Sequence, residues 1–139
     1  MALIEINGLY KSFNNVRAIN NLNLSLEGGK IVGLLGPNGS GKTTLIKLIN
    51  DLLKPDIGSI RVDGMEPGID TKKIVAYLPD RNTLPSYMTI EELINMQADF
   101  FKDFDVNKAN TMISNMELNP KLRFKSLSKG MGEKVQLAL

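Results

Sequence analysis

Cysteine, histidine and tryptophan are all absent from the 139-residue sequence. Without cysteine the chain cannot form disulfides, zinc–thiolate sites or a thiol nucleophile, and without histidine it lacks imidazole catalysis and the commonest metal ligand. No apolar run approaches the roughly 18 residues of a membrane span. The first residues also lack the basic start and long apolar core of a secretory signal. We therefore expect a cytosolic location.

The charge balance is also small, with a formal net charge of +2. A surface of that charge does not favour nucleic acid as the main partner. Hydrophobic residues make up 42% of the chain and charged residues 23%, which suits one globular domain or a piece of a larger one. The functional signal must therefore come from motifs.

The strongest motif is the stretch Gly36-Pro37-Asn38-Gly39-Ser40-Gly41-Lys42-Thr43, which fits the pattern G-x-x-x-x-G-K-[ST] without a mismatch. Glycines let the backbone curl so that successive N–H groups point at one anion. Lys42 adds a positive charge for the β- and γ-phosphates, and the Thr43 hydroxyl suits Mg²⁺. The motif predicts a phosphate-binding loop.

The context of the loop supports this interpretation. Residues 31–35 form a continuous apolar run between glycines, which is typical of a strand buried on both faces. After the loop, Leu45, Leu48, Ile49 and Leu52 recur at helical spacing. Strand, loop and helix thus follow in the required order. The alternative is a glycine-rich turn that happens to precede a lysine.

Further strands are predicted over residues 2–7, 18–26, 59–62 and 74–78, the last as a second buried strand. Asn14-Asn15 is a turn signal between the first two. Asp70 is expected to cap a helical turn that runs through Lys73.

Residues 84–125 read as a small helical insert. Thr89 and Glu92 form a capping box, and the helix runs on toward Phe101. Asp105 is expected to cap a second helix that ends at Asn119-Pro120. We expect the methionine and phenylalanine stripe on these helices to be core.

The last informative stretch runs from Ser126 to Glu133. Ser128 is suited to cap the helix that follows. This stretch is either an ordinary helix start with flexible glycines or a second anion-binding helix N-terminus.

Together these motifs resemble the ATP-binding subunit of an ABC transporter. The loop at 36–43 resembles the family's phosphate loop, Leu127-Ser128-Lys129-Gly130-Met131 its L-S-G-G-Q signature, and Tyr77-Leu78-Pro79-Asp80 its Y-L-P-Q segment. The resemblance implies an α/β fold, namely a P-loop NTPase core with an N-terminal antiparallel β subdomain and a helical insert. The implied domains are 1–83, 84–125 and 126–139.

The resemblance also implies residue roles. Phe13 falls where the family places an aromatic that stacks on adenine, with Val16 beside it, and Tyr10 competes for that role. Phe13 could instead be a packing aromatic. The residues expected along the phosphates are Gly36, Asn38, Gly39, Ser40, Gly41, Lys42, Thr43 and Thr44.

Two departures from the family pattern affect the expected site. Asp80 replaces the usual glutamine, so a shorter, charged group would have to reach Mg²⁺; it could also be only a turn residue after proline. In the signature, Lys129 replaces a glycine and Met131 the glutamine. The family's signature, here residues 127–131, contacts the γ-phosphate held by a second subunit.

The resemblance implies that Mg-ATP binds here and that a head-to-tail dimer hydrolyses ATP to drive transport. Residues 84–125 would dock on membrane-spanning subunits at the inner face of the membrane. The family's next segment, a strand ending in Asp-Glu, does not occur by residue 139, so we expect a C-terminal part of the core to be missing and this chain to be inactive alone. A soluble, non-transport relative and a nucleotide-binding module stay open as alternatives.

Overall fold

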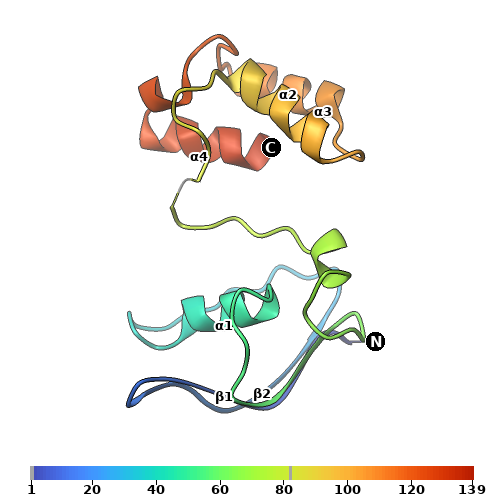
Figure 1. Ribbon diagram of the computed structural model, residues 1–139, viewed down its shortest axis with the longest axis vertical. Coiled ribbons are helices and arrows are strands. Elements are labelled where there is room, and N and C mark those ends of the chain that lie inside the picture. The colour runs from blue at the N-terminus through green and yellow to red at the C-terminus, as the bar shows by residue number, and fades with distance from the viewer. Residues whose placement is uncertain (1, 82) are drawn as a thin grey trace. The chain divides into compact units, whose positions relative to one another are not determined.

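The computed structural model describes residues 2–81 and 83–139. The chain forms two compact units, Met1–Tyr77 and Leu78–Leu139. Strands occur in the first unit, and the three longer helices of the second lie close to one another (Figure 1). Each unit has its own apolar core and is described by itself.

The first unit is built on a three-stranded antiparallel sheet in the order β2-β1-β3. The strands are β1 (Ala2–Phe13), β2 (Val16–Glu27) and β3 (Ile57–Val62). The predicted turn joins β1 to β2, with Asn14 at φ 51°, a backbone conformation that asparagine tolerates better than most residues. The strands predicted at 2–7, 18–26 and 59–62 are therefore confirmed, and the first is longer than expected.

The helix α1 (Lys42–Ile49) follows the predicted phosphate loop and packs on this sheet (Figure 1). Its leucines provide the reason, because Leu45 and Leu48 lie one turn apart on the same side and both are buried. The buried core of this unit also takes residues from the sheet: Ile6, Leu9, Ile19 and Ile60. This packing fixes the start of α1 relative to β1 and β2.

The buried strands predicted at 31–35 and 74–78 are wrong. Ile31 and Leu35 are 105% and 93% exposed, and neither stretch is part of a strand. A strand that is apolar on both faces needs neighbours that supply hydrogen bonds and cover. Among residues 2–81 and 83–139, no segment forms a β-bridge with either stretch.

The second unit contains α2 (Ile90–Phe100), α3 (Val106–Asn115) and α4 (Lys129–Ala138), with a short 3-10 helix, η2 (Phe124–Ser126), before α4. The predicted caps are present. Thr89 and Glu92 form the reciprocal capping box, with bonds of 2.7 and 3.1 Å. The Asp105 carboxylate accepts from the Lys108 N–H at 2.9 Å. The helix α3 ends at Asn115, four residues before the predicted stop.

The core of the second unit takes residues from all three α-helices and from the segment between α3 and α4: Ile90, Leu93, Ile94, Ala109, Ile113, Leu118, Phe124, Val135 and Ala138. The predicted methionines pack partly buried against it, whereas Phe100 and Phe101 are exposed. The buried residues of α2 all lie in its first half, so its C-terminal aromatics find no cover there.

The 3-10 helix η1 (Thr71–Lys73) occupies the predicted helical turn after Asp70. Asp70 does not cap it with its side chain, because its carboxylate pairs with Lys73 at 2.7 Å. Within the described residues, no helix has both the length and the apolar character needed to cross a membrane.

Candidate functional site

The predicted phosphate loop is wound around its own lysine. The Lys42 ammonium donates to the carbonyls of Gly36 and Pro37 at 2.6 and 2.7 Å, and it lies 3.4 Å from the Ser40 hydroxyl. The Ser40 N–H closes the turn on the Pro37 carbonyl at 3.2 Å. A side chain six residues from Gly36 thus holds the loop curled and keeps a positive charge at its centre.

Gly41 is the last loop residue and the N-cap of α1. Its φ of 90° lies in the left-handed region, which glycine adopts without steric cost. A Cβ at this position would lie 2.3 Å from the carbonyl oxygen of Ala18 in β2. Only glycine therefore fits between the loop and the sheet, which gives this motif position a tertiary reason.

The N-terminus of α1 receives no side-chain cap. The other three α-helices of the described chain do, from Thr89, Asp105 and Ser128. The first N–H groups of a helix have no partner within the helix and carry partial positive charge. Thr43 and Thr44 lie in this first turn, and Thr43 is exposed. The α1 N-terminus, with Lys42 beside it, is thus arranged to receive an anion.

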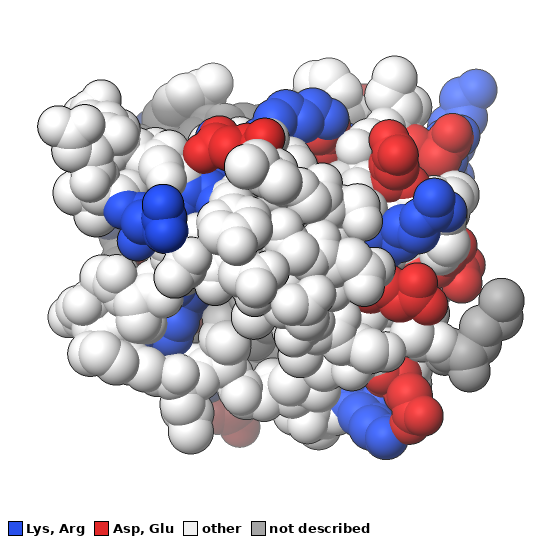
Figure 2. Space-filling view, turned by 90° about the horizontal axis from the view of Figure 1, so that it is seen from below, with Lys and Arg blue, Asp and Glu red and all other residues white. Residues whose placement is uncertain are grey.

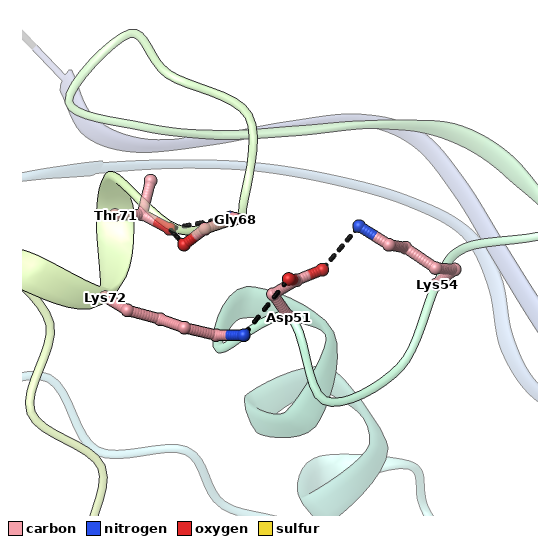
Figure 3. Close-up of polar contacts among 5 residues, drawn as sticks. All are labelled: Asp51, Lys54, Gly68, Thr71 and Lys72. Atoms are coloured by element: carbon pink, nitrogen blue, oxygen red, sulfur yellow. Dashed lines mark hydrogen bonds and ion pairs between the residues drawn. The ribbon is translucent and has the colours of Figure 1, made fainter.

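The other end of α1 is fixed by an ion-pair cluster (Figure 3). The Asp51 carboxylate pairs with Lys54 at 2.5 Å and with Lys72 of η1 at 3.3 Å. Hydrogen bonds from Lys54 and then Lys72 lower the pKa of Asp51. Beside them, the buried Thr71 hydroxyl donates to the Gly68 carbonyl and accepts from the Gly68 N–H. The cluster ties the loop helix to the segment that follows β3.

Phe13 and Val16, the predicted adenine contacts, face each other across the first hairpin as a register pair. Phe13 is 43% exposed and Val16 is 69% exposed, so both can be reached by a ligand. Tyr10, the competing aromatic, is less exposed, and the Arg17 guanidinium lies 5.9 Å from its ring centre. Exposure at the turn end of the hairpin therefore favours Phe13 over Tyr10 as the residue that could contact a base.

Asp80 and the signature-like stretch belong to the second unit. A pocket of about 270 Å³ is lined by Asp80 together with Leu127, Ser128 and Lys129. The Ser128 hydroxyl caps α4 by accepting from the Met131 N–H at 3.3 Å. Because a hydroxyl that accepts can still donate its own proton, this cap is compatible with an anion contact. Gly130 lies in the first turn, where an added Cβ would meet nothing within 4 Å.

The described residues contain no group of three or more acidic, histidine or cysteine side chains that could hold a metal ion. Mg²⁺ at nucleotide sites is usually held by one or two protein groups together with phosphate oxygens and water. The exposed Thr43 hydroxyl at the start of α1 fits such a ligand. The chemistry of this residue therefore suits a metal that arrives with a nucleotide.

Figure 2 shows charge of both signs on one face of the molecule. In the face shown in Figure 2, basic and acidic side chains lie next to one another along the margin, and uncharged side chains cover the middle. The small net charge of +2 agrees with this mixture. Nucleic acid binding would favour a continuous basic face.

Sequence reasoning missed the two ionic clusters that brace the first unit. Asp51 joins Lys72 across 21 positions, and Asp56 joins Lys11 across 45. Nothing in the local pattern marks these carboxylates, because their partners come from other elements.

Similarity to known proteins agrees with the geometry. A family model described as ABC transporter matches residues 19–139. The ABC transporter ATP-binding protein YtrB of Bacillus subtilis is 32% identical over 141 residues, which cover 99% of this chain and 48% of YtrB. The chain spans about half the length of the curated relatives it matches.

Solved structures share the fold. A putative ABC transporter ATP-binding protein from Pyrococcus furiosus superposes with a TM-score of 0.82 at 29% identity, over 97% of this chain and 68% of that one. The ATP-binding cassette MJ0796, in a dimeric post-hydrolysis state bound to ADP and Pi, gives 0.80 at 22% identity, over 97% and 67%. The phosphate loop, the uncapped N-terminus of α1 and the order of the motifs agree with these similarities. The chain therefore belongs to the ABC transporter family and has the fold of its ATP-binding domain.

Proposed function

We propose that this chain is the nucleotide-binding part of an ABC transporter ATP-binding subunit and that it binds Mg-ATP at Gly36–Thr44. The observation that carries the proposal is the start of α1, the one α-helix of the described chain whose N-terminus has no side-chain cap, next to the centred Lys42 ammonium. A triphosphate would satisfy both, because its oxygens accept hydrogen bonds from the first N–H groups of α1 and its negative charge pairs with the Lys42 ammonium.

The roles of the loop residues follow from chemistry. The N–H groups of Gly36, Asn38, Gly39 and Gly41, and of the first turn through Thr44, would bind phosphate oxygens. The Ser40 N–H would exchange its bond to the Pro37 carbonyl for one to a phosphate oxygen. Each hydrogen bond to a charged group contributes roughly 1.5–3 kcal/mol. Thr43 would hold Mg²⁺, and Asp80 is a second proposed ligand. The metal neutralises charge on the phosphates when bound. Lys42 would stabilise the charge of the terminal phosphates.

The base would contact the hairpin. Phe13 would stack on the adenine ring, with Val16 beside it, and such stacking contributes about 1 kcal/mol. The exposure of both residues at the end of β1 and start of β2 supports this proposal. The phosphate loop would therefore dominate affinity, and the hairpin would tune it.

Hydrolysis and transport are proposed for the full-length subunit in a dimer. Leu127–Met131 of one subunit would contact the nucleotide of the other, and the helical insert at 84–125 would dock on membrane-spanning subunits at the cytoplasmic face. The dimer of MJ0796 bound to ADP and Pi supports this arrangement by its fold. ATP would favour the closed dimer and hydrolysis the open one, so the difference in affinity would move the membrane partner.

The test of nucleotide binding is a calorimetric titration of Mg-ATP into the wild-type chain, Lys42→Ala and Lys47→Ala. Lys47 is the matched control, because it removes the same charge from the same helix away from the loop. Lys42→Ala should weaken binding at least tenfold, which corresponds to about 1.4 kcal/mol. Lys47→Ala should bind like wild type. Equal affinity of all three proteins would show that the loop is not the site.

A further inference from the structure

Asp56 connects β3 to the bulged end of β1 by three hydrogen bonds. One carboxylate oxygen accepts from the Lys11 ammonium at 2.7 Å, and the other accepts from the Ser12 N–H at 2.7 Å. The Asp56 N–H donates to the Tyr10 carbonyl at 3.0 Å. With the backbone fixed on both sides, the carboxylate fixes the position of the lysine head.

The fixed ammonium lies 5.6 Å from the centre of the Phe13 ring. The Lys11 side chain is only 15% exposed and is paired with Asp56, so its charge has little freedom to move. Phe13 itself is 43% exposed. The Phe13 ring therefore has a fixed cation near it and remains accessible to a ligand.

Tyr10, the neighbouring aromatic, also has a cation near its ring, but among the described residues that cation is not held by a carboxylate. Arg17 lies 5.9 Å from the Tyr10 ring, but its guanidinium donates to the neutral Asn20 amide oxygen at 3.2 Å. In the described part of the chain, no carboxylate forms an ion pair with Arg17 within 4.0 Å. Of the two cation–ring pairs, only that of Phe13 is anchored by a carboxylate.

A cation near an aromatic ring draws π-electron density toward itself. The rest of the ring becomes less electron-rich and stacks better on an electron-rich purine, because repulsion between the two π-clouds is reduced. The same contact restricts the rotamers of Phe13, which lowers the entropy lost when a base binds. Both effects act on the base and neither acts on the phosphates.

We propose that Lys11 and Asp56 are positioning residues for the purine, with Asp56 holding Lys11 and Lys11 orienting and polarising the Phe13 ring. This inference rests on the proposed function, in which Phe13 contacts adenine. It gives a role to two residues that lie outside the motifs. The hydrogen bond from Lys11, followed by that from Ser12, lowers the pKa of Asp56, so the anchor is charged at neutral pH.

The experiment compares two ligands, Mg-ATP and inorganic tripolyphosphate, because only ATP carries a base. Affinities are measured by titration for wild type, Lys11→Met, Lys11→Arg, Asp56→Asn and Phe13→Ala. Lys11→Met keeps the apolar stem but removes the charge, and should weaken ATP binding about threefold with unchanged tripolyphosphate binding. Lys11→Arg should restore most of the ATP affinity, and Asp56→Asn should fall between Lys11→Met and wild type.

A double variant separates positioning from general stability. In Phe13→Ala, the further change Lys11→Met should have no effect on ATP affinity, because the lysine acts through the ring. Arg17→Met is the matched control, since it removes a cation from the competing Tyr10 ring, and its ATP affinity should equal that of wild type. Thermal melts identify any variant that fails to fold. If Lys11→Met fails to fold, Asp56→Asn carries the comparison, because it should still weaken ATP binding and leave tripolyphosphate binding unchanged.

The outcomes are distinguishable. If Phe13→Ala weakens ATP alone but Lys11→Met and Asp56→Asn match wild type for both ligands, the positioning role is overturned and the proposed adenine contact stands. If Arg17→Met weakens ATP binding and Phe13→Ala does not, Tyr10 contacts the base. The adenine contact proposed for Phe13 and the positioning role of Lys11 are then both overturned. If wild type binds neither ligand, the proposed function itself is overturned.

Discussion

The N-termini of α1 and α2 differ in how they are capped. Thr89 and Glu92 complete α2 with a reciprocal pair of bonds at its N-terminus. In α1 the cap is Gly41, which has no side chain, and the nearest charged group is Lys42. One helix is completed by the chain itself, and the other leaves its donors without a side-chain acceptor.

The same contrast separates the two units. In the helical unit, polar side chains near helix starts stabilise the fold, and Ser128 does so for α4 as well. In the sheet unit, ion pairs at Asp51 and Asp56 brace the elements around the loop, while the loop itself is held by its own carbonyls and lysine. Stability is provided around the site, so the helix terminus can be used for binding.

The largest expected effect tests whether the two cores are separate. Leu93→Ala removes a fully buried side chain from the core of the helical unit and should cost about 2–5 kcal/mol of unfolding free energy. Mg-ATP binding by the sheet unit should be unchanged. Chemical denaturation and titration measure the two quantities. The control is Leu137→Ala, which makes the same change at a position that is 63% exposed. A loss of ATP affinity in Leu93→Ala alone would show that the units depend on each other.

The next prediction sets two glycines against each other. Gly41→Ala must place a Cβ against the Ala18 carbonyl at a positive φ, so it should weaken Mg-ATP binding at least tenfold and lower stability. Gly130→Ala, at an open position in α4, should instead raise stability by up to about 1 kcal/mol, since alanine is the better helix former. Melting curves and titrations decide. Equal effects from the two changes would contradict the assigned role of Gly41.

Removing a cap from α2 should have a smaller effect. Thr89→Ala loses the hydroxyl that accepts from the Glu92 N–H and should cost about 1 kcal/mol without altering nucleotide binding. Thr111→Ala is the control, because its exposed hydroxyl bonds only within its own helix. Urea denaturation measures both variants. If Thr89→Ala were as stable as Thr111→Ala, the capping box would contribute nothing measurable.

The smallest effect concerns acid. Ion pairs lower the pKa values of Asp51 and Asp56 below their ordinary 3.8. The unfolded chain therefore takes up protons first as pH falls. The contribution of these two carboxylates to stability is complete above their unfolded-state pKa and is lost as pH falls through their lowered folded-state pKa values. Melting temperatures of wild type and Asp56→Asn between pH 2.5 and 6 should converge at the acid end. A constant gap across this range would exclude the ion pair as its cause.

Local patterns predicted the elements whose partners lie within a few residues. The loop at 36–43, the capping box at Thr89, the cap at Asp105 and the turn at Asn14 depend on interactions between near neighbours, and all four are present. The site residues proposed from those patterns lie in two units, with the phosphate loop in one and the signature-like stretch in the other.

The predictions that failed depended on distant partners. Residues 31–35 have the composition of a buried strand, but a strand exists only where another strand pairs with it. Phe100 has the spacing of a core residue, but α2 buries only its first half.

The chemistry at the start of α1 follows from the sequence alone, because the glycines, the lysine and the threonine act within one short loop. The folded chain was needed to show why Gly41 must be glycine, which carboxylate holds Lys11 near Phe13, and how Asp51 ties α1 to η1. The physical reason is the range of the interactions. Backbone curl and helix capping act over three or four residues, whereas steric approach and ion pairing join segments that only the folded chain brings together.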